Sequence, residues 1–204
     1  MSSREKILSA IRSSQPAFRE LPALPTGQPA APQELAERFS KVLEAIGGAV
    51  YFVPGFDAVA KILKELHPGA KRIVSDCPEL AALAERPSGE EDPHSFEDID
   101  VTVLRAQFGV AENGACWITE ERMIERAVPF ICQHLALVID KKDIVPSMHE
   151  AYDRIAGEVY GFGTFIAGPS KTADIEQSLV LGAHGPRSMV AFVLDMDAQD
   201  AGFY

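Results

Sequence analysis

Residues 132–160 read CQHLALVIDKKDIVPSMHEAYDRIAGEVY, and this stretch contains the pattern that decides the fold class. Residues 132–140 are predicted to form a strand, because their apolar side chains first alternate and then run continuously. Residues 143–160 are then predicted to form a helix that carries one apolar side, made of Ile144, Met148, Tyr152 and Ile155. A strand followed directly by an amphipathic helix is typical of α/β proteins.

The same alternation continues in both directions along the chain. Apolar patterning and turn residues predict helices at 32–46, 56–66 and 78–84, and strands at 49–53 (buried), 72–75, 101–104, 164–167 and 189–195. The pair Asn113-Gly114 lies between apolar runs at 108–112 and 115–119, which predicts a hairpin. We therefore expect an α/β fold with a mostly parallel but mixed sheet and helices on both faces.

The chain divides into two parts at about residue 31. Ser2 and Glu5 fit a capping box that opens a helix ending near residue 13. The residues up to 31 carry four prolines and little periodicity, which is typical of an extended linker. We therefore predict an N-terminal helix and proline-rich linker over 1–31, and one α/β domain over 32–204.

Composition and charge exclude several classes of function. Lysine and arginine total 19 against 30 aspartates and glutamates, a net charge of −11, which disfavours nucleic-acid binding. No segment approaches the roughly 20 apolar residues that span a bilayer, and no apolar signal core follows the start, so we expect a cytoplasmic protein.

Neither the cysteines nor most of the histidines have the spacing of a metal site. Cys77, Cys116 and Cys132 include no Cys-x-x-Cys pair, so we expect structural thiols and no iron–sulfur cluster or zinc in this chain. The histidines at 67, 94, 134 and 149 show no ligand spacing and are assigned structural or surface roles. No metal site is predicted.

The first stretch with chemical potential is Glu112-Asn113-Gly114. A glutamate stands where a strand meets a tight turn, and such a carboxylate could serve as a base or nucleophile. Asn113 and Gly114 could contribute to ligand binding beside it. The same three residues also fit a plain hairpin turn with a solvated glutamate, and the local pattern alone leaves both interpretations open.

The second stretch is rich in glycine and polar residues and lies between two predicted strands. Its candidate ligand-binding residues are Gly168, Pro169, Ser170, Lys171, Thr172, Asp174, Glu176, His184, Gly185 and Arg187. Ser170 or Thr172 could cap a following helix, whose exposed N–H groups would bind phosphate or carboxylate together with Lys171. We expect these polar loops to lie at the carboxyl ends of strands and to converge with residues 112–114 on one anion pocket. Two ordinary turns with satisfied polar groups remain the alternative.

The run GPSKTADIE at 168–176, followed by LVLGAHGPR at 179–187, resembles the signature of the LUD domain family, closest to its lactate-utilisation protein C (LutC or YkgG) type. The segment REKILSAIR at 4–12 is similar to the amino end of that family. The resemblance covers nearly all 204 residues. It implies a three-layer fold like that of ribose-5-phosphate isomerase, glucosamine-phosphate deaminase (NagB) and the CoA transferases.

The resemblance also implies a function. It points to a component of an iron–sulfur-dependent system that oxidises L-lactate to pyruvate, with the clusters on partner subunits and a small carboxylate or phosphate-bearing ligand on this chain. The family usually has Glu-Thr-Gly or Asp-Thr-Gly where this chain has Glu112-Asn113-Gly114. That variant resembles the Ser-Glu-Asn-Gly of CoA transferases, so an acyl or CoA transferase with Glu112 as nucleophile is the alternative. Whether this chain is an enzyme by itself stays open, and a sugar-phosphate isomerase or metabolite sensor is a third, weaker possibility.

Overall fold

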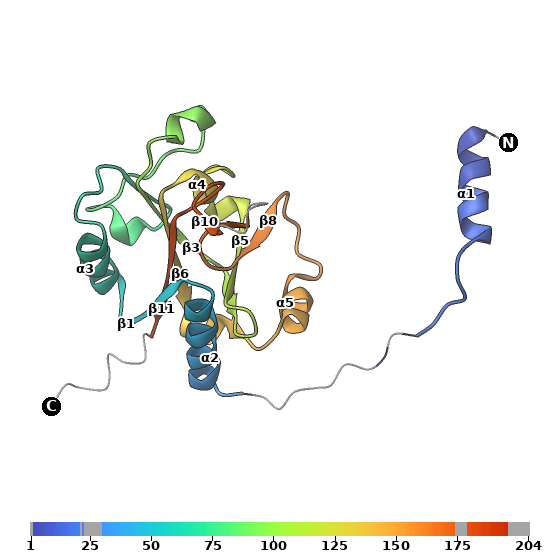
Figure 1. Cartoon of the computed structure of the whole chain (residues 1–204), viewed down its shortest axis with the longest axis horizontal. Helices are drawn as coiled ribbons and strands as arrows, with labels where there is room; N and C mark the ends of the chain where they lie inside the picture. Colours follow the sequence, from blue (N-terminus) through green and yellow to red (C-terminus); the bar gives the residue numbers. More distant parts are fainter. Residues whose placement is uncertain (1, 21, 23–29, 174–178, 196–204) are drawn as a thin grey trace.

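The computed structural model describes residues 2–20, 22, 30–173 and 179–195 (Figure 1). The α-helices are α1 (Ser3–Ser13), α2 (Pro32–Ala45), α3 (Phe56–Leu66), α4 (Val128–Ile131) and α5 (Met148–Ile155). The strands are β1 (Ala49–Val53), β2 (Ile73–Ser75), β3 (Val101–Arg105), β4 (Phe108–Val110), β5 (Ala115–Thr119), β6 (His134–Asp140), β7 (Ile144–Val145), β8 (Gly163–Ile166), β9 (Lys171–Ala173), β10 (Leu179–Leu181) and β11 (Ser188–Leu194).

Five parallel strands form the central sheet. Their order is β1-β11-β6-β3-β2, and every neighbouring pair runs in the same direction. His134, the first residue of β6, pairs with Ser188, and Asp140, its last residue, pairs with Leu194. We call the two ends of this sheet the amino edge and the carboxyl edge, after the ends of its strands.

A second sheet of four short strands, in the order β7-β4-β5-β8, packs beside the first. The β4–β5 hairpin and the β5–β8 pair are antiparallel, whereas β4 and β7 are parallel. The hairpin around Asn113-Gly114 is therefore confirmed, but it belongs to this second sheet and does not make the central sheet mixed. A separate antiparallel pair joins β9 to β10.

The alternation of β6 side chains explains the layers, because successive residues of a strand face opposite sides. Leu135, Leu137 and Ile139 pack with α2 and the inner face of the second sheet. Ala136 and Val138 pack on the other face with α3. Figure 1 shows α3 on one side of the central sheet, α2 and the second sheet on the other, and α5 outside the second sheet. The expected α/β fold with helices on both faces is confirmed.

Three expected elements differ from the structure. Strand β1 is an edge strand and is not buried throughout, since Phe52 is 45% exposed. The short helix predicted over 78–84 is a single 3₁₀ turn, Pro78–Leu80. The helix predicted over 143–160 is shorter: residues 144–145 form β7, and α5 begins only after its N-cap Ser147.

The N-terminal helix forms as expected. Ser2 and Glu5 exchange the two hydrogen bonds of a capping box at the start of α1. None of its residues is buried, and Figure 1 shows it standing away from the rest of the fold. Within the described ranges, no helix has the length and apolar character needed to cross a bilayer.

Candidate functional site

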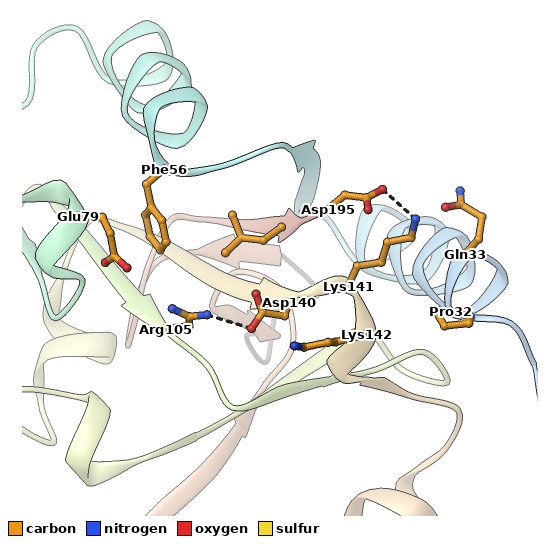
Figure 2. A pocket seen from close by; sticks show the side chains of 10 residues that line it. Pro32, Gln33, Phe56, Glu79, Arg105, Asp140, Lys141, Lys142 and Asp195 are labelled. Carbon is orange, nitrogen blue, oxygen red and sulfur yellow. Dashed lines mark hydrogen bonds and ion pairs between the residues drawn. The ribbon is translucent and has the colours of Figure 1, made fainter. Parts of the chain in front are cut away.

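A cavity of about 490 Å³ opens at the carboxyl edge of the central sheet (Figure 2). Its lining residues are Pro32, Gln33, Phe56, Glu79, Arg105, Asp140, Lys141, Lys142, Leu194 and Asp195. Arg105 ends β3, Asp140 ends β6 and Leu194 ends β11. Open α/β sheets bind ligands at this edge, and a cavity of this size is usual for a small-molecule site. We call this cavity the carboxyl-edge pocket.

Two ion pairs hold the charged side chains in place. Arg105 donates to Asp140 at 2.9 Å, and Lys141 donates to Asp195 at 2.8 Å, as Figure 2 shows. Burial is the largest single effect on Arg105 and lowers its pKa, but the hydrogen bond to Asp140 and the negative charges of Asp140 and Glu79 together outweigh it, so the pKa is raised and the guanidinium stays charged. In the described part of the chain, Lys142 and Glu79 form no such pair and remain able to bind a ligand.

Two helix starts contribute partial positive charge to the same pocket. Pro32 and Gln33 form the first turn of α2, and Phe56 is the first residue of α3. No side chain caps either helix, because the N-cap residues are Ala31 and Gly55. Their first N–H groups and helix dipoles favour an anionic group, while Glu34 and Asp57 stand in the same first turns. The lining itself carries equal numbers of acidic and basic side chains.

A buried carboxylate supports the end of β3. Asp76 follows β2, and its Oδ1 accepts a hydrogen bond from the backbone N–H of Arg105 at 2.9 Å. Its Oδ2 is buried without a hydrogen-bond partner and lies 3.7 Å from the Arg122 guanidinium. Burial raises the pKa of Asp76 despite these contacts. Asp76 therefore positions the backbone from which Arg105 reaches the pocket.

The predicted residues 112–114 do not line the carboxyl-edge pocket. The exposed carboxylate of Glu112 accepts a hydrogen bond at 2.8 Å from the N–H of Met148, the first residue of α5. The Asn113 side chain accepts from the N–H of Ala115, which stabilises the turn. Gly114 has φ of +69° and packs against Leu43 of α2. These contacts assign the turn a structural role and add no support for a nucleophilic Glu112.

The second predicted stretch contains the separate β9–β10 pair and lies toward the amino edge of the central sheet. Gly168 packs against Ile46, and the Lys171 side chain lies beside Gly47, so both flank the C-terminal end of α2. Ser170 donates its N–H to Pro186 and accepts from the N–H of Gly182, and Gly185 packs against Ser170. The structure thus brings residues 168–171 and 182–187 together. The α2 end that they contact, at Ile46 and Gly47, lies about one helical turn beyond Leu43, which Gly114 contacts.

The expected helix after residue 170 is wrong, because Lys171 and Thr172 belong to β9 and pair with β10. The loop with His184, Gly185 and Arg187 precedes β11 and so lies at the amino edge, not at a carboxyl end. Pro169 lies near Gly47, and His184 is exposed. Asp174 and Glu176 fall outside the described residues. In the described part of this stretch, residues 168–173 and 179–187, no helix begins that could bind an anion at its first turn.

The sequence contains a signal for the residues of the carboxyl-edge pocket that motif reasoning does not detect. Arg105, Asp140 and Asp195 each stand directly at or after the end of an apolar strand, where side chains meet at one edge of a parallel sheet. Which of these ends are neighbours depends on the strand order, which the sequence does not reveal. Among the described residues, no three His, Cys, Asp or Glu side chains lie close enough to hold a metal ion.

Comparisons with known proteins agree on one family. The model of the LUD domain matches residues 36–194, more than three quarters of the chain. Lactate utilization protein C of Bacillus subtilis is 32% identical over 115 residues, which cover 53% of this chain and 48% of that protein. Lactate utilization protein C of Geobacillus kaustophilus is 26% identical over 172 residues, 79% of this chain and 69% of that protein.

The chain matches about half the length of the first of these curated relatives. A solved structure has a similar fold: a DUF162 family protein from Deinococcus radiodurans superposes with a TM-score of 0.64 at 17% identity, covering 82% of this chain and 100% of that chain. The matched region includes both sheets, helices α3 to α5 and the strand ends that form the carboxyl-edge pocket. The chain therefore belongs to the LUD domain family.

Proposed function

We propose that this protein takes part in lactate utilisation, as the non-redox component of an iron–sulfur-dependent system that oxidises L-lactate to pyruvate. The proposal rests on membership of the LUD domain family and on relatives named lactate utilization protein C. In this scheme the two electrons released from lactate pass to clusters on partner subunits. This chain supplies a ligand site and a docking surface in the cytoplasm.

The single structural observation behind the ligand site is the carboxyl-edge pocket. Lys142 and Arg105 can bind a carboxylate or phosphate, and the uncapped starts of α2 and α3 offer backbone N–H donors beside them. Glu79 and Asp140 can accept hydrogen bonds from a hydroxyl on the same ligand. The cavity of about 490 Å³ is much larger than a three-carbon acid, so a larger phosphate-bearing ligand also fits.

Co-expression tests the proposed role. The tagged chain is produced together with cysteine-rich iron–sulfur proteins of the proposed system, and L-lactate-dependent dye reduction is measured on the purified material. We expect co-purification, and pyruvate formation that depends on all components. A chain that never associates with these partners, or a lactate oxidation that is unchanged when this chain is omitted, would contradict the proposal.

A matched pair of lysine variants connects the pocket with the function. Lys142→Gln removes a pocket charge that has no ion-pair partner among the described residues. The change therefore leaves no carboxylate without its ion-pair partner. Lys61→Gln removes an exposed charge from α3 outside the pocket. We expect a loss of lactate-dependent turnover of about tenfold for Lys142→Gln, the value of one charged hydrogen bond, and none for Lys61→Gln.

A further inference from the structure

A second cavity, of about 380 Å³, opens at the opposite end of the central sheet. Its lining residues are Leu66, His67, Gly69, Ala70, Asp100, Gln133, His134 and Arg187. His134 begins β6, whereas Asp140 of the carboxyl-edge pocket ends it, so the two cavities lie about 20 Å apart along one strand. We call this cavity the amino-edge pocket.

Two imidazoles face each other in the amino-edge pocket. The rings of His67, which caps the end of α3, and His134 stack with centroids 4.3 Å apart and planes inclined by 30°. Nδ1 of His134 lies 2.8 Å from the hydroxyl of Ser188, the residue paired with it across the sheet. That contact fixes the His134 ring, and no other hydrogen bond to either imidazole forms among the described residues.

Arg187 adds a permanent positive charge to this pair. Its backbone N–H is anchored on the carbonyl of Gln133 at 2.8 Å, immediately before His134. Its side chain packs over Gly182, where a Cβ would collide with Cγ of Arg187. The left-handed glycine, with φ of +75°, therefore leaves the room that the arginine stem occupies beside the pocket.

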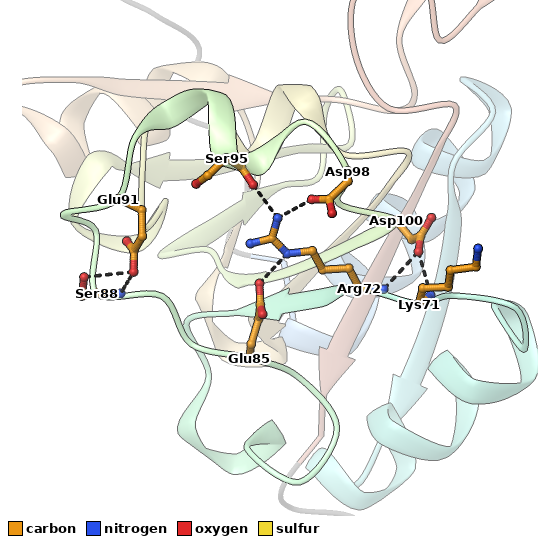
Figure 3. A network of polar contacts seen from close by, with 8 residues as sticks. All are labelled: Lys71, Arg72, Glu85, Ser88, Glu91, Ser95, Asp98 and Asp100. Atoms are coloured by element: carbon orange, nitrogen blue, oxygen red, sulfur yellow. Dashed lines mark hydrogen bonds and ion pairs between the residues drawn. The ribbon is translucent and has the colours of Figure 1, made fainter.

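The pocket contains little negative charge to balance these groups. Asp100 is the acid that lines it, and Figure 3 shows its carboxylate bound to the backbone N–H groups of Lys71 and Arg72, at 2.7 and 3.0 Å. The Arg72 guanidinium turns to Glu85 and Asp98 instead. Lys71 lies near Asp100 and adds further positive charge at the rim of this pocket.

Burial lowers the pKa of both histidines, and each has a further cationic neighbour that acts in the same direction. For His67 that neighbour is His134, and for His134 it is Arg187, while Asp100 acts against it. Both rings are therefore mainly neutral at neutral pH, and protonating them brings three positive charges together. A bound anion removes that repulsion.

We propose that the amino-edge pocket is a second ligand site, in which His67, His134 and Arg187 bind a small tetrahedral oxyanion such as a phosphate group and take up protons as they do so. Arg187 and the ring N–H groups donate to the oxyanion, and the Gln133 amide adds a further donor. Binding and protonation are linked, so affinity rises as the pH falls. The site is independent of the proposed role of the carboxyl-edge pocket.

Side-chain NMR of the full-length protein tests the proposal, with sulfate and inorganic phosphate as probes. Sulfate keeps its charge across the range from about pH 8 to about pH 6, so its binding reports protein protonation alone, whereas phosphate itself titrates. We expect the imidazole pKa of His67 and His134 to rise by about one unit at saturating sulfate. His94 is exposed in the loop after β2 and serves as the internal control. Sulfate should leave the NMR signals of its ring unchanged.

The affinity for sulfate should increase as the pH falls, by up to about tenfold per pH unit for each proton taken up. Two variants should each lower the affinity for sulfate about tenfold or more. They are Arg187→Gln, which changes an exposed side chain, and His134→Gln, whose amide can still form a hydrogen bond with Ser188. His94→Gln should leave the affinity unchanged. Equal affinity of the Arg187→Gln variant and the parent, or binding without any change in the two imidazole pKa values, would overturn the proposal. The NMR titration of the parent needs no variant, so a misfolded His134→Gln would not leave the question open.

Discussion

Gly114→Ala should destabilise the protein strongly, because the glycine at this turn lies against the backbone of α2. A Cβ built there would stand 2.9 Å from both the N and Cα atoms of Leu43, which are backbone atoms that cannot move aside. The φ of +69° adds a second penalty for any L side chain.

The magnitude follows from those two effects. The left-handed conformation costs about 1 kcal/mol or slightly more, and the overpacking costs about 1–3 kcal/mol. Alanine also lowers the conformational entropy of the unfolded chain, which stabilises the folded state by about 0.5 kcal/mol and partly offsets these costs. We therefore expect a loss of about 1.5–3.5 kcal/mol in the free energy of unfolding, or about 3–14 °C in Tm for a chain of 204 residues.

Urea denaturation followed by Trp117 fluorescence and far-UV circular dichroism measures this loss. Gly55→Ala is the matched control, because Gly55 has extended φ and no atom within 4 Å of a built Cβ. It should change the free energy of unfolding by less than about 1 kcal/mol. A Gly114→Ala variant as stable as Gly55→Ala would refute the packing of the 112–114 turn on α2.

Three further predictions concern buried acids, thiols and the N-terminal helix. The pKa of Asp76 is raised by burial in the folded state, so its contribution to stability is present at low pH and is lost as the pH rises through that value. Asp76→Asn keeps an acceptor for the Arg105 N–H, and thermal melts should show it gaining stability relative to the parent as the pH rises from about 4 to about 7; a constant difference would contradict this. Burial raises the pKa of the thiols to about 12 for Cys77 and Cys116 and about 11 for Cys132, so a disulfide reagent at about pH 8 should react with all three only after unfolding. Deleting residues 1–20 should leave Tm within about 1 °C, because α1 has no buried residue, and a larger shift would reveal a packing role for this helix.

Much of the fold could be predicted because local patterns determine it. Pro32 and the stripe of Leu35, Phe39 and Leu43 predict α2, and all three stripe residues are buried in the structure. Asn113-Gly114 predicts the hairpin, since few other residue pairs tolerate its backbone geometry. In these places a few neighbouring residues hold enough information.

The predicted secondary structure differs from the observed one where pairing with residues distant in the sequence determines it. Residues 144–145 continue the amphipathic pattern of α5, but they pair with β4 and so become a strand. Ser147 and Glu150 have the spacing of a helix start and could have corrected that boundary. Lys171 and Thr172 follow a cap-like serine, yet pairing with β10 makes them a strand. Long-range pairing of this kind leaves no mark on the local sequence.

The carboxyl-edge pocket could not be predicted from the sequence for the same reason. Glycine and polar residues at 168–187 pointed to a ligand, and Arg187 does line a cavity, but at the amino edge. Arg105, Asp140 and Lys142 converge only because β3 and β6 are neighbours in the sheet. The sequence shows charged residues at strand ends. The strand order decides which of these residues are neighbours, and only the structure gives that order.

Backbone and side-chain NMR of the parent protein, titrated with L-lactate, pyruvate and a phosphate-bearing compound, tests the ligand role of the carboxyl-edge pocket most directly. If that role is correct, at least one of these anions shifts the signals of Arg105, Lys142 and the first turns of α2 and α3, and Lys142→Gln weakens its binding about tenfold. If none of the anions shifts these signals, or if Lys142→Gln binds as tightly as the parent, the carboxyl-edge pocket is not the ligand site of this protein.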